Sequence, residues 1–415
     1  MRIALTSVLV LTAVACSPEA PLPEAAPAAE SAAGLHDRLL VMDTHLDTPA
    51  NFSKADFDIL ADNPSVLGSV QVDLPKMQRG GLDGGFWVIF TPQGPLDAES
   101  YEAAKQAALT RGDEIQAMVA ANPDSFEMAY TSADAGRIAA AGKRIVYQSM
   151  ENSYPIGTDL SLVEVFYDKG LRMIGPVHFR DNQFADSATD FSASDHGGLS
   201  PLGEELVKEA NRLGMILDGS HAADSTVDDM IALSATPLIL SHTGVKAVYD
   251  HPRNIDDTLM RKIADDGGVI QINAYGGYLE PLEPTPERQA ALDALEVEFE
   301  GISPLTADDE TRERYFARRE EVDTAFPAPR STFEKFIEHL LHALEIVGPD
   351  HVGMGADWDG GGGVEGMEDV SFLPKVTERL LAEGYTEAEI QKFWSGNMLR
   401  LMEQAEAAKQ GPSAE

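Results

Sequence analysis

A histidine and an aspartate, His45 and Asp47, lie two residues apart at the end of the apolar run Leu39–Met42. Alternate residues of a β-strand point to the same face, so both side chains can project together from the end of one strand. A neutral imidazole and a carboxylate in that arrangement can bind a divalent metal ion such as zinc. The pair alone is weak evidence, because a His-x-Asp tripeptide arises by chance in many proteins.

The same arrangement, an apolar run that ends in a residue able to bind a metal, recurs along the chain. Later runs of this kind end at Glu151, His178, His221, His242 and Asp357. Taken singly, each of these residues has an ordinary structural explanation, such as a helix cap or a surface histidine. Four of the ten histidines and three acids at predicted strand ends nevertheless favour one shared metal site.

The elements that must position these residues alternate regularly. Eight apolar, strand-like runs are separated by amphipathic stretches, the clearest of which cover 98–122, 202–213, 224–233, 333–347 and 386–401. This pattern predicts an α/β fold, a (β/α)8 TIM-type barrel, in which functional residues gather at the C-terminal ends of the strands. An open, doubly wound sheet is the alternative, but only closure brings the last strand back to the first.

One stretch falls outside the alternation. Residues 280–330 are acidic, contain several prolines, and follow the seventh predicted strand. We expect a helical insertion here, either a solvated cover over the barrel mouth or a dimer face. A docking surface for another protein is a further interpretation.

The chemistry of the predicted site follows from its residue types. The lone cysteine, Cys16, excludes a cysteine-based zinc site, so any metal must be held by His, Asp and Glu. A single zinc ion could be held by His45, Asp47, His221 and His242. The two oxygens of Glu151 could instead bridge two ions, which in two-metal sites lie about 3.5–4 Å apart and share a hydroxide of lowered pKa. Asp357 is then placed to act as a general base and acid, passing a proton from the nucleophile to a leaving amine.

Composition limits the class of partner. The chain has 415 residues, and 31 Lys and Arg against 69 Asp and Glu give a formal net charge of −38. Nucleic acids and anionic membrane surfaces would be repelled by this charge. A hydrophobic content of 43% and a charged content of 24% are typical of a globular protein with a sizeable core.

The N-terminus predicts export. Arg2 is followed by a short apolar run and by Ala13-Val14-Ala15-Cys16, which resembles the lipobox of bacterial lipoproteins. We expect residues 1–15 to be a removed signal peptide, Cys16 to carry the lipid, and 16–34, rich in Ala, Pro and Glu, to be a tether. Ser17 after the cysteine fits sorting to the periplasmic side of the outer membrane. An ordinary signal peptide cleaved nearby is the alternative. The folded barrel is predicted over 35–405, with a disordered tail over 406–415.

Five motifs together resemble the membrane (renal) dipeptidase family, zinc-dependent barrels of the amidohydrolase superfamily. They are Asp43-Thr44-His45-Leu46-Asp47, Ser220-His221, Ser241-His242-Thr243, Arg253-Asn254 and Gly353-Met354-Gly355-Ala356-Asp357-Trp358-Asp359-Gly360. The resemblance extends from about Leu35 to Leu401, and the motifs occur in the family's order.

The resemblance implies a role for each matching residue. One zinc ion would be bound by His45 and Asp47, the other by His221 and His242, and Glu151 would bridge them. His178 matches a histidine that polarises the scissile carbonyl. Arg253 matches the group that binds the substrate's free carboxylate, Asp357 the catalytic acid, and Tyr278 a substrate-contacting tyrosine.

The chain departs from the family in places. Thr44 and Leu46 stand where the family commonly has Gly and Asn, which would alter the pocket near the substrate amine but not the metal ligands. Mammalian members are linked by disulfides and carry a C-terminal lipid anchor, whereas this chain has neither feature and is predicted to be anchored at its other end. The dimeric relatives make a homodimer an expectation to test.

The function that follows is hydrolysis of dipeptides with a free C-terminal carboxylate, extending to a C-terminal D-residue. Because a barrel does not fix its substrate, hydrolysis of N-acyl amino acids, amides or lactones is the alternative. A metal-binding lipoprotein without catalysis is a third interpretation, which Asp357 and His178 disfavour, since a metal store needs neither.

Overall fold

The computed structural model describes residues 32–64, 70–192, 194–301 and 309–410. The predicted signal peptide, Cys16, most of the predicted tether and residues 411–415 lie outside this range. The first described helix, α1, is Ala32–His36 and the last, α15, is Asn397–Ala408, so helical structure extends three residues beyond each predicted limit of the barrel. Within the described residues, no helix combines the length and the apolar character needed to cross a membrane.

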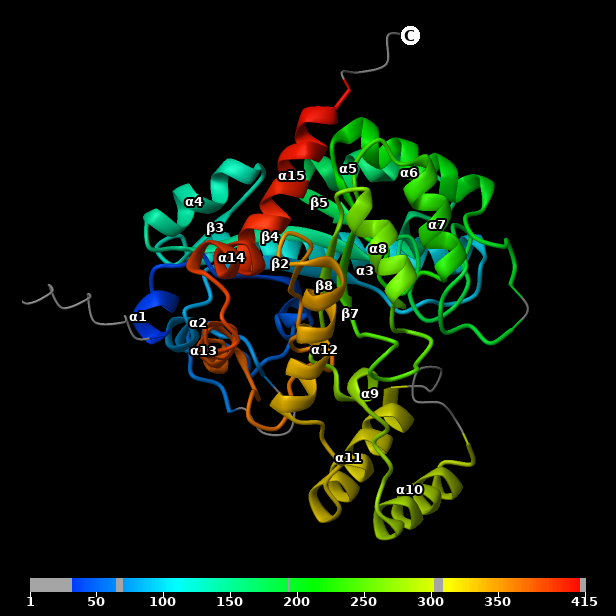
Figure 1. The fold of residues 1–415 in the computed structure, drawn as a ribbon. Coiled ribbons are helices and arrows are strands. Elements are labelled where there is room, and N and C mark those ends of the chain that lie inside the picture. The colour runs from blue at the N-terminus through cyan, green and yellow to red at the C-terminus, as the bar shows by residue number, and fades with distance from the viewer. Residues whose placement is uncertain (1–31, 65–69, 193, 302–308, 411–415) are drawn as a thin grey trace, which may run out of the picture. The chain divides into compact units, whose positions relative to one another are not determined.

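Eight parallel strands form the centre of the fold (Figure 1). They are β1 (Met42–Leu46), β2 (Gly84–Phe90), β4 (Arg144–Glu151), β5 (Leu171–Ile174), β6 (Ile216–Leu217), β7 (Ile239–Thr243), β8 (Val269–Ile272) and β9 (Val352–Met354). The first five pair in the order β1-β2-β4-β5-β6, and the other three in the order β7-β8-β9. These are the eight strands that the sequence predicts.

Two single bridges join the two runs of strands into a closed ring. Asp218, directly after β6, bridges to Ile239 of β7, and Leu46 of β1 bridges to Trp358 beyond β9, both in parallel. At the second seam, the N–H of Asp47 donates to the carbonyl of Trp358 at 2.8 Å. The predicted TIM-type barrel is therefore confirmed, and its closure brings the segment after β9 beside β1.

Helices alternate with the strands, as predicted. They are α2 (Leu74–Gly80), α3 (Ala98–Ala121), α4 (Ser132–Ala140), α5 (Ser161–Asp168), α6 (Pro201–Leu213), α7 (Asp224–Leu233), α8 (Asp257–Asp265), α12 (Phe333–Val347), α13 (Pro374–Ala382) and α14 (Glu387–Gln391). Three short 3₁₀ turns cover Thr48–Asn51, Tyr154–Ile156 and Val370–Phe372. Side-chain caps start several helices: Asp256 accepts hydrogen bonds from the N–H groups of Thr258 and Leu259, both at 2.8 Å.

Two details differ from the sequence prediction. The helix expected over 386–401 is divided, because a π-helical stretch, Lys392–Gly396, joins α14 to α15. A short strand, β3 (Phe126–Met128), pairs with the start of β4 but lies outside the ring of eight. Three residues are too few to show the alternation by which a strand is recognised in a sequence.

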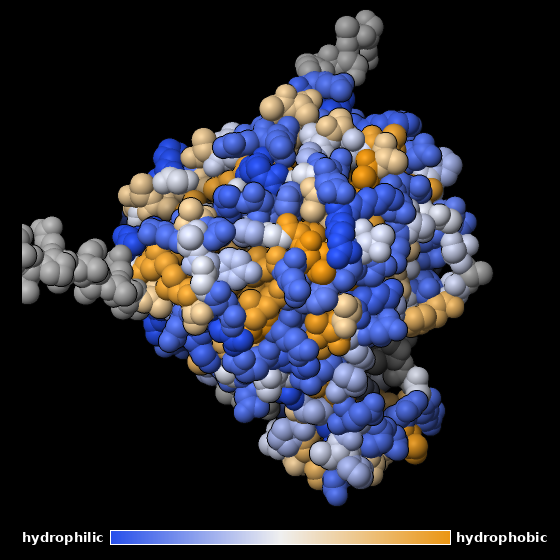
Figure 2. Space-filling view, viewed as in Figure 1, coloured by the Kyte–Doolittle hydropathy of each residue, from blue (hydrophilic) through white to orange (hydrophobic). Residues whose placement is uncertain are grey.

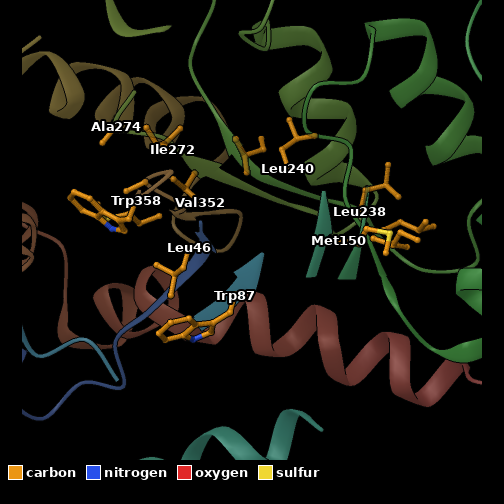
Figure 3. Packing of buried hydrophobic residues seen from close by; sticks show 14 of the residues in the cluster. Leu46, Trp87, Met150, Leu238, Leu240, Ile272, Ala274, Val352 and Trp358 are labelled. Carbon is orange, nitrogen blue, oxygen red and sulfur yellow. The ribbon is translucent and has the colours of Figure 1, made fainter. Parts of the chain in front are cut away.

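Apolar side chains fill the barrel and its seams (Figure 3). Leu46, Trp87, Ile272, Val352 and Trp358 are fully buried. Strands of a parallel barrel have helices on one side and the packed interior on the other, which explains why they appear as nearly continuous apolar runs in the sequence. Dense packing around Leu46 and Trp358 fixes the seam from which the predicted site residues project.

The predicted insertion after the seventh strand is present. It comprises α9 (Gly276–Leu279), α10 (Pro286–Glu298) and α11 (Asp309–Ala325), and in Figure 1 the last two lie at the bottom, below the barrel. Their surface is mostly hydrophilic (Figure 2). The two helices are joined by Arg288, whose Nη2 is 2.6 Å from Oδ1 of Asp323, and by the rings of Phe299 and Tyr315 at 5.3 Å.

Candidate metal centre

The five predicted metal ligands lie together at the C-terminal ends of the strands. His45 is in β1 and Asp47 follows it, Glu151 is the last residue of β4, His242 is in β7, and His221 lies four residues beyond β6. The exposed fraction of these side chains ranges from 1% for His242 to 13% for Asp47. Closure of the barrel is what assembles residues that are far apart in the chain.

Glu151 is at the centre of the cluster. Its Oε1 lies 3.0 Å from Nε2 of His221 and 3.4 Å from Nε2 of His242, while its Oε2 lies 3.7 Å from Nε2 of His45. The Nε2 atoms of His221 and His242 are 3.0 Å apart. One carboxylate oxygen therefore faces each side of the cluster, as a bridging carboxylate requires.

These separations fit a bound metal ion. Ligand atoms about 2.0–2.1 Å from a tetrahedral ion lie about 3.3 Å from one another, close to the separations around Glu151. Among the described residues, Nε2 of His45 is buried without a hydrogen bond of good geometry, although Oδ2 of Asp47 is 3.3 Å away. Burial lowers the pKa of His45, but the charges of Glu151 and Asp47 outweigh it and raise this pKa well above its usual value, so a metal ion would displace a proton from the ring on binding.

The cluster is large enough for more than one ion. Three sets of ligand atoms lie within 4.8 Å of one another: His45, Glu151 and His242; Glu151, His178 and His221; and His45, Asp47 and Asp357. The sets overlap at His45 and Glu151, so neighbouring ions could share these two side chains.

The electrostatics of the cluster favour cation binding. Burial opposes the charge of Glu151, but His178 and His45 outweigh it and hold the pKa of this carboxyl well below its usual range. Burial, reinforced by nearby positive groups, lowers the pKa of His221 and of His242 well below the ordinary value. The cluster therefore presents an ionised carboxylate and two neutral imidazoles, the protonation states that ligate metals.

Asp357 lies against Asp47 on the other side of the barrel seam. A Cβ added at Gly360 would come within 2.1 Å of Oδ2 of Asp47 and 2.2 Å of Oδ1 of Asp357, so both carboxylates depend on the glycine for space. Burial, and next the charge of Asp47, raises the pKa of Asp357 well above its usual range. A carboxylate with a raised pKa is a stronger base than an ordinary one, and once protonated it can return the proton as a general acid.

Backbone strain accompanies two of the site residues. His221 and Asp357 have φ angles of 67° and 64°, in the left-handed region that non-glycine residues rarely adopt. Each of these residues turns the chain at the end of a strand so that its side chain enters the cluster. Strain of this kind commonly persists at functional sites because the surrounding structure enforces it.

A hydrogen-bonded chain behind the cluster orients His242. Oγ of Ser241 accepts from Nδ1 of His242 at 2.9 Å when that nitrogen is protonated, and itself donates to Oδ2 of Asp218. Oδ1 of Asp218 accepts from the N–H groups of Ser220 and Ser241, both at 2.9 Å. A proton on Nδ1 leaves Nε2 free to face Glu151, so Asp218 supports the imidazole without touching a ligand position.

Asp43 has a corresponding role at the barrel seam. Its carboxylate accepts from the N–H of His45 at 2.8 Å and from the N–H of Ala356 at 3.1 Å. It thereby joins β1 to the residue before Asp357. Burial raises the pKa of Asp43 to about 7, although these two main-chain donors oppose the shift.

His178 lies beside the cluster, four residues beyond β5. Its Nε2 is 3.8 Å from Oε1 of Glu151, and its ring contacts the tilted rings of Phe90 and Phe179, whose centroids are 4.8 and 3.8 Å away. Burial lowers the pKa of His178, which favours the neutral ring. The half-exposed ring of Phe179 covers it on the solvent side.

Arg253 is buried directly behind His242. Its Nη2 donates to the carbonyl of His242 at 2.7 Å, while its Nε is buried without a hydrogen-bond partner among the described residues. The guanidinium carbon lies 5.5 Å from the ring centroid of Tyr278. The structure thus brings both predicted substrate-binding residues together beside the cluster.

Sequence reasoning missed the supporting residues Asp43, Asp218 and Ser241 and the spacing residue Gly360. A signal was present for Asp218, the last residue of the apolar run that leads to Ser220 and His221. Its hydrogen bonds, however, reach Ser241 on the next strand, and only the folded barrel brings the two together. No spacing rule along the chain predicts such a contact.

The fold and this cluster together define a metal-dependent hydrolase built on a TIM-type barrel. The chain belongs to the membrane dipeptidase family, peptidase family M19, whose model matches residues 29–415. It is therefore a dipeptidase of the metallopeptidase class, within the amidohydrolase superfamily.

Individual relatives agree with this assignment. The chain is 28% identical over 340 residues to the dipeptidase tcpJ of Claviceps purpurea, covering 81% of this chain and 69% of the relative. A crystal structure of the probable dipeptidase PvdM from Pseudomonas aeruginosa is 31% identical, with a TM-score of 0.77 and coverage of 91% and 98%. A metallopeptidase from Rhodobacter sphaeroides, liganded with a phosphinate mimic of the dipeptide L-Ala-D-Ala, is 27% identical, with a TM-score of 0.68 and coverage of 88% and 99%.

Proposed function

We propose that this dipeptidase binds two zinc ions and cleaves dipeptides that have a free C-terminal carboxylate, including those with a C-terminal D-residue. The observation that carries the proposal is the position of a buried arginine directly behind a buried cluster of metal ligands. A dipeptide separates its scissile carbonyl from its carboxylate by only a nitrogen and an α-carbon. The groups that bind the scissile carbonyl and the carboxylate must therefore be as close together as His242 and Arg253 are.

The ligands of the proposed centre divide into two sets. His45 and Asp47 would hold one ion, His221 and His242 the other, and Glu151 would bridge them. Two zinc ions, when bound, supply a hydroxide nucleophile of lowered pKa and polarise the substrate carbonyl.

The protein's own side chains supply proton transfer and charge stabilisation. Asp357, whose pKa is raised by burial and by Asp47, would accept a proton from the nucleophile and return it to the leaving amine. His178, kept neutral by burial, would donate a hydrogen bond to the carbonyl oxygen as negative charge develops there.

Arg253 and Tyr278 would bind the C-terminal residue. The free Nε of Arg253 is available to a carboxylate, while Nη2 is fixed by the carbonyl of His242. Because the whole guanidinium is buried, an anion paired with it would be well shielded from water. The L-Ala-D-Ala mimic bound by the Rhodobacter sphaeroides relative supports acceptance of a D-residue.

The location of the enzyme is part of the proposal. Residues 1–15 would be removed on export, Cys16 would carry the lipid, and residues 16–34 would tether the barrel to the periplasmic side of the outer membrane. The barrel itself would cover 35–405, and a homodimer would be its assembly. Mass spectrometry of the membrane fraction for a lipidated Cys16, and the mass of the particle in solution, test these two expectations.

The test of the activity combines a metal assay with three substrates. The purified full-length chain is analysed for metal per polypeptide and then given L-Ala-L-Ala, L-Ala-D-Ala and N-acetyl-L-alanine. The proposal expects about two zinc ions per chain and cleavage of both dipeptides. Activity on N-acetyl-L-alanine alone would transfer the function to N-acyl amino acids, which share the free carboxylate. Failure to bind metal after zinc is added would overturn the assignment of the ligands.

A further inference from the structure

A pocket of about 600 Å³ lies between the barrel and the insertion. The barrel contributes Gly361–Gly363 of the loop after β9, and the insertion contributes Gly276 and Gly277 of α9. The side chains that line the pocket include Tyr249, His251, Tyr275, Arg288, Arg319 and Arg330. A volume of this size exceeds what a small amino-acid side chain needs and falls in the range of small-molecule sites.

The pocket adjoins the proposed position of the substrate's C-terminal residue. The ring of Tyr278, which faces Arg253, lies 4.5 Å from the ring of Tyr275 and 5.1 Å from that of His251, and the last two residues line the pocket. On the other side, Gly361 belongs to the loop that begins at Asp357, and a Cβ there would come within 2.7 Å of the Tyr275 ring. The ring of Tyr278 is therefore all that separates Tyr275 of the pocket from Arg253, and the loop of the proposed general acid forms part of the pocket wall.

The charges that line the pocket do not cancel. Three arginines, Arg288, Arg319 and Arg330, face two acids, Glu280 and Asp323, which leaves one positive charge in excess. Asp323 is shared by two of the arginines, since its Oδ1 lies 2.6 Å from Nη2 of Arg288 and 3.1 Å from Nε of Arg319. This excess is found in a chain whose formal net charge is −38, so it is not a consequence of general composition.

Of the three pocket arginines, Arg330 is the one whose positive charge is not paired with a carboxylate of the described residues. Among the described residues it forms no ion pair, and its Nη2 donates only to the carbonyl of Gly363, at a long 3.4 Å. Its main chain is nevertheless fixed, because the N–H of Glu365 donates to the carbonyl of the next residue, Ser331, at 2.8 Å. Oε1 of Glu280 accepts a hydrogen bond from the hydroxyl of Ser331 at 2.7 Å.

We propose that the pocket receives the side chain of the substrate's C-terminal residue and that Arg330 selects an acidic side chain there, Asp or Glu. The assignment rests on the proposed function, because it takes the substrate carboxylate to lie at Arg253. A substrate anchored at Arg253 and packed on Tyr278 would lie one ring away from Tyr275, which lines the pocket together with Arg330. A carboxylate there gains a charge-assisted hydrogen bond that the neutral isostere glutamine cannot form.

The experiment compares kcat/KM for L-Ala-Glu and L-Ala-Gln, each with an L- and a D-residue at the second position. Three zinc-loaded proteins are used: the wild type, Arg330→Gln, and the control Arg261→Gln, which removes an exposed arginine of α8 that does not line the pocket. We expect the wild type and the control to prefer Glu over Gln by about tenfold, mainly through KM. In Arg330→Gln we expect that ratio to fall to about one.

The outcomes separate the two proposals. Equal rates on Ala-Glu and Ala-Gln in the wild type, or a ratio that survives in Arg330→Gln, would overturn the pocket assignment and leave the dipeptidase function intact. Glu-Ala and Gln-Ala are measured in the same way, and a preference that appears only in this second pair would also overturn it, by assigning the pocket to the N-terminal residue. No cleavage of any dipeptide would overturn the proposed function and, with it, this assignment.

Discussion

The metal centre and the pocket beside it are built in opposite ways. In the centre, each predicted ligand is at or just beyond the end of a barrel strand and is almost fully buried, and His242 is oriented through Ser241 and Asp218. The pocket is bounded by glycine main chain of the loop after β9 on the barrel side and by side chains of the insertion on the other, which range from the buried Arg288 to the exposed Arg330. Packing and hydrogen bonds hold the side chains of the centre in place, whereas side chains around the pocket can be substituted with little effect on the barrel.

This difference indicates that catalysis and substrate selection belong to different parts of the fold. Chemistry that any peptide bond requires is assigned to strand ends, where packing and hydrogen bonds hold ligands in position. Discrimination among substrates is assigned to the insertion, where a changed side chain does not disturb the barrel. Substitutions in the centre should therefore change metal content and turnover, and substitutions near the pocket should leave both metal and chemistry in place.

The largest effect is expected from Glu151→Gln. Among the described residues, Glu151 has the only carboxylate that faces His45, His221 and His242 together, so both proposed ions would lose a ligand and a compensating charge. We expect metal content to fall below one ion per chain and kcat/KM to fall on the order of 10³-fold. Metal analysis and dipeptide hydrolysis test it, with Glu205→Gln on the exposed face of α6 as the control. Full metal content in Glu151→Gln would show that the carboxylate is not a bridge.

Asp357→Asn should separate chemistry from metal binding. The amide keeps the shape of the side chain but cannot accept and return a proton, so turnover should fall by about 10²–10³-fold. Metal content should be unchanged, because the proposed ligand sets are complete without Asp357. The measurement is kcat together with zinc per chain. A near-normal kcat would remove Asp357 from the reaction, and a loss of zinc would make it a ligand.

The sequence predicted the metal centre because its residues belong to a local pattern. A ligand-type side chain at the end of an apolar run can be recognised one strand at a time, and the alternation of strands and helices places all such ends at one face. That reasoning named His45, Asp47, Glu151, His221 and His242 as candidate ligands, whereas Arg253 and Tyr278 were predicted only from the resemblance to the dipeptidase family. All eight strands and the position of the insertion were predicted in the same way.

The pocket could not be predicted, because no local pattern encodes it. Its residues come from the loop after β7, from α9, α10 and α11 with the segments that flank them, and from the loop after β9, and their proximity depends on how the insertion packs on the barrel. Arg288, Arg319 and Arg330 are separated by irregular distances in an acidic segment, where they resemble ordinary surface charges. The same limitation applies to Asp218, whose partner Ser241 is on a neighbouring strand.

A smaller effect is expected from Asp218→Asn, which tests whether the support behind the centre matters. Asparagine can still accept hydrogen bonds from the N–H groups of Ser220 and Ser241, but it loses the charge that holds the Ser241 hydroxyl toward it. We expect zinc affinity to weaken by about 10–100-fold, measured by competition with a chelator. Excess zinc should restore most activity, which it would not do for a misfolded chain. Unaltered affinity would reduce Asp218 to a purely structural residue.

The smallest effect is expected from Asp323→Asn, which reports on the insertion alone. Arg288, with 4% of its side chain exposed, would lose its carboxylate partner, at a cost of about 1–2 kcal/mol because Asp323 is itself partly exposed. We expect the melting temperature to fall by about 2–4 °C while zinc per chain stays at the wild-type value. The matched control is Asp228→Asn, which breaks a pair with Lys262 whose two side chains are about half exposed and should not change the melting temperature. A loss of zinc in Asp323→Asn would mean that the insertion and the centre form one cooperative structure, and the division of work inferred from their different construction would be wrong.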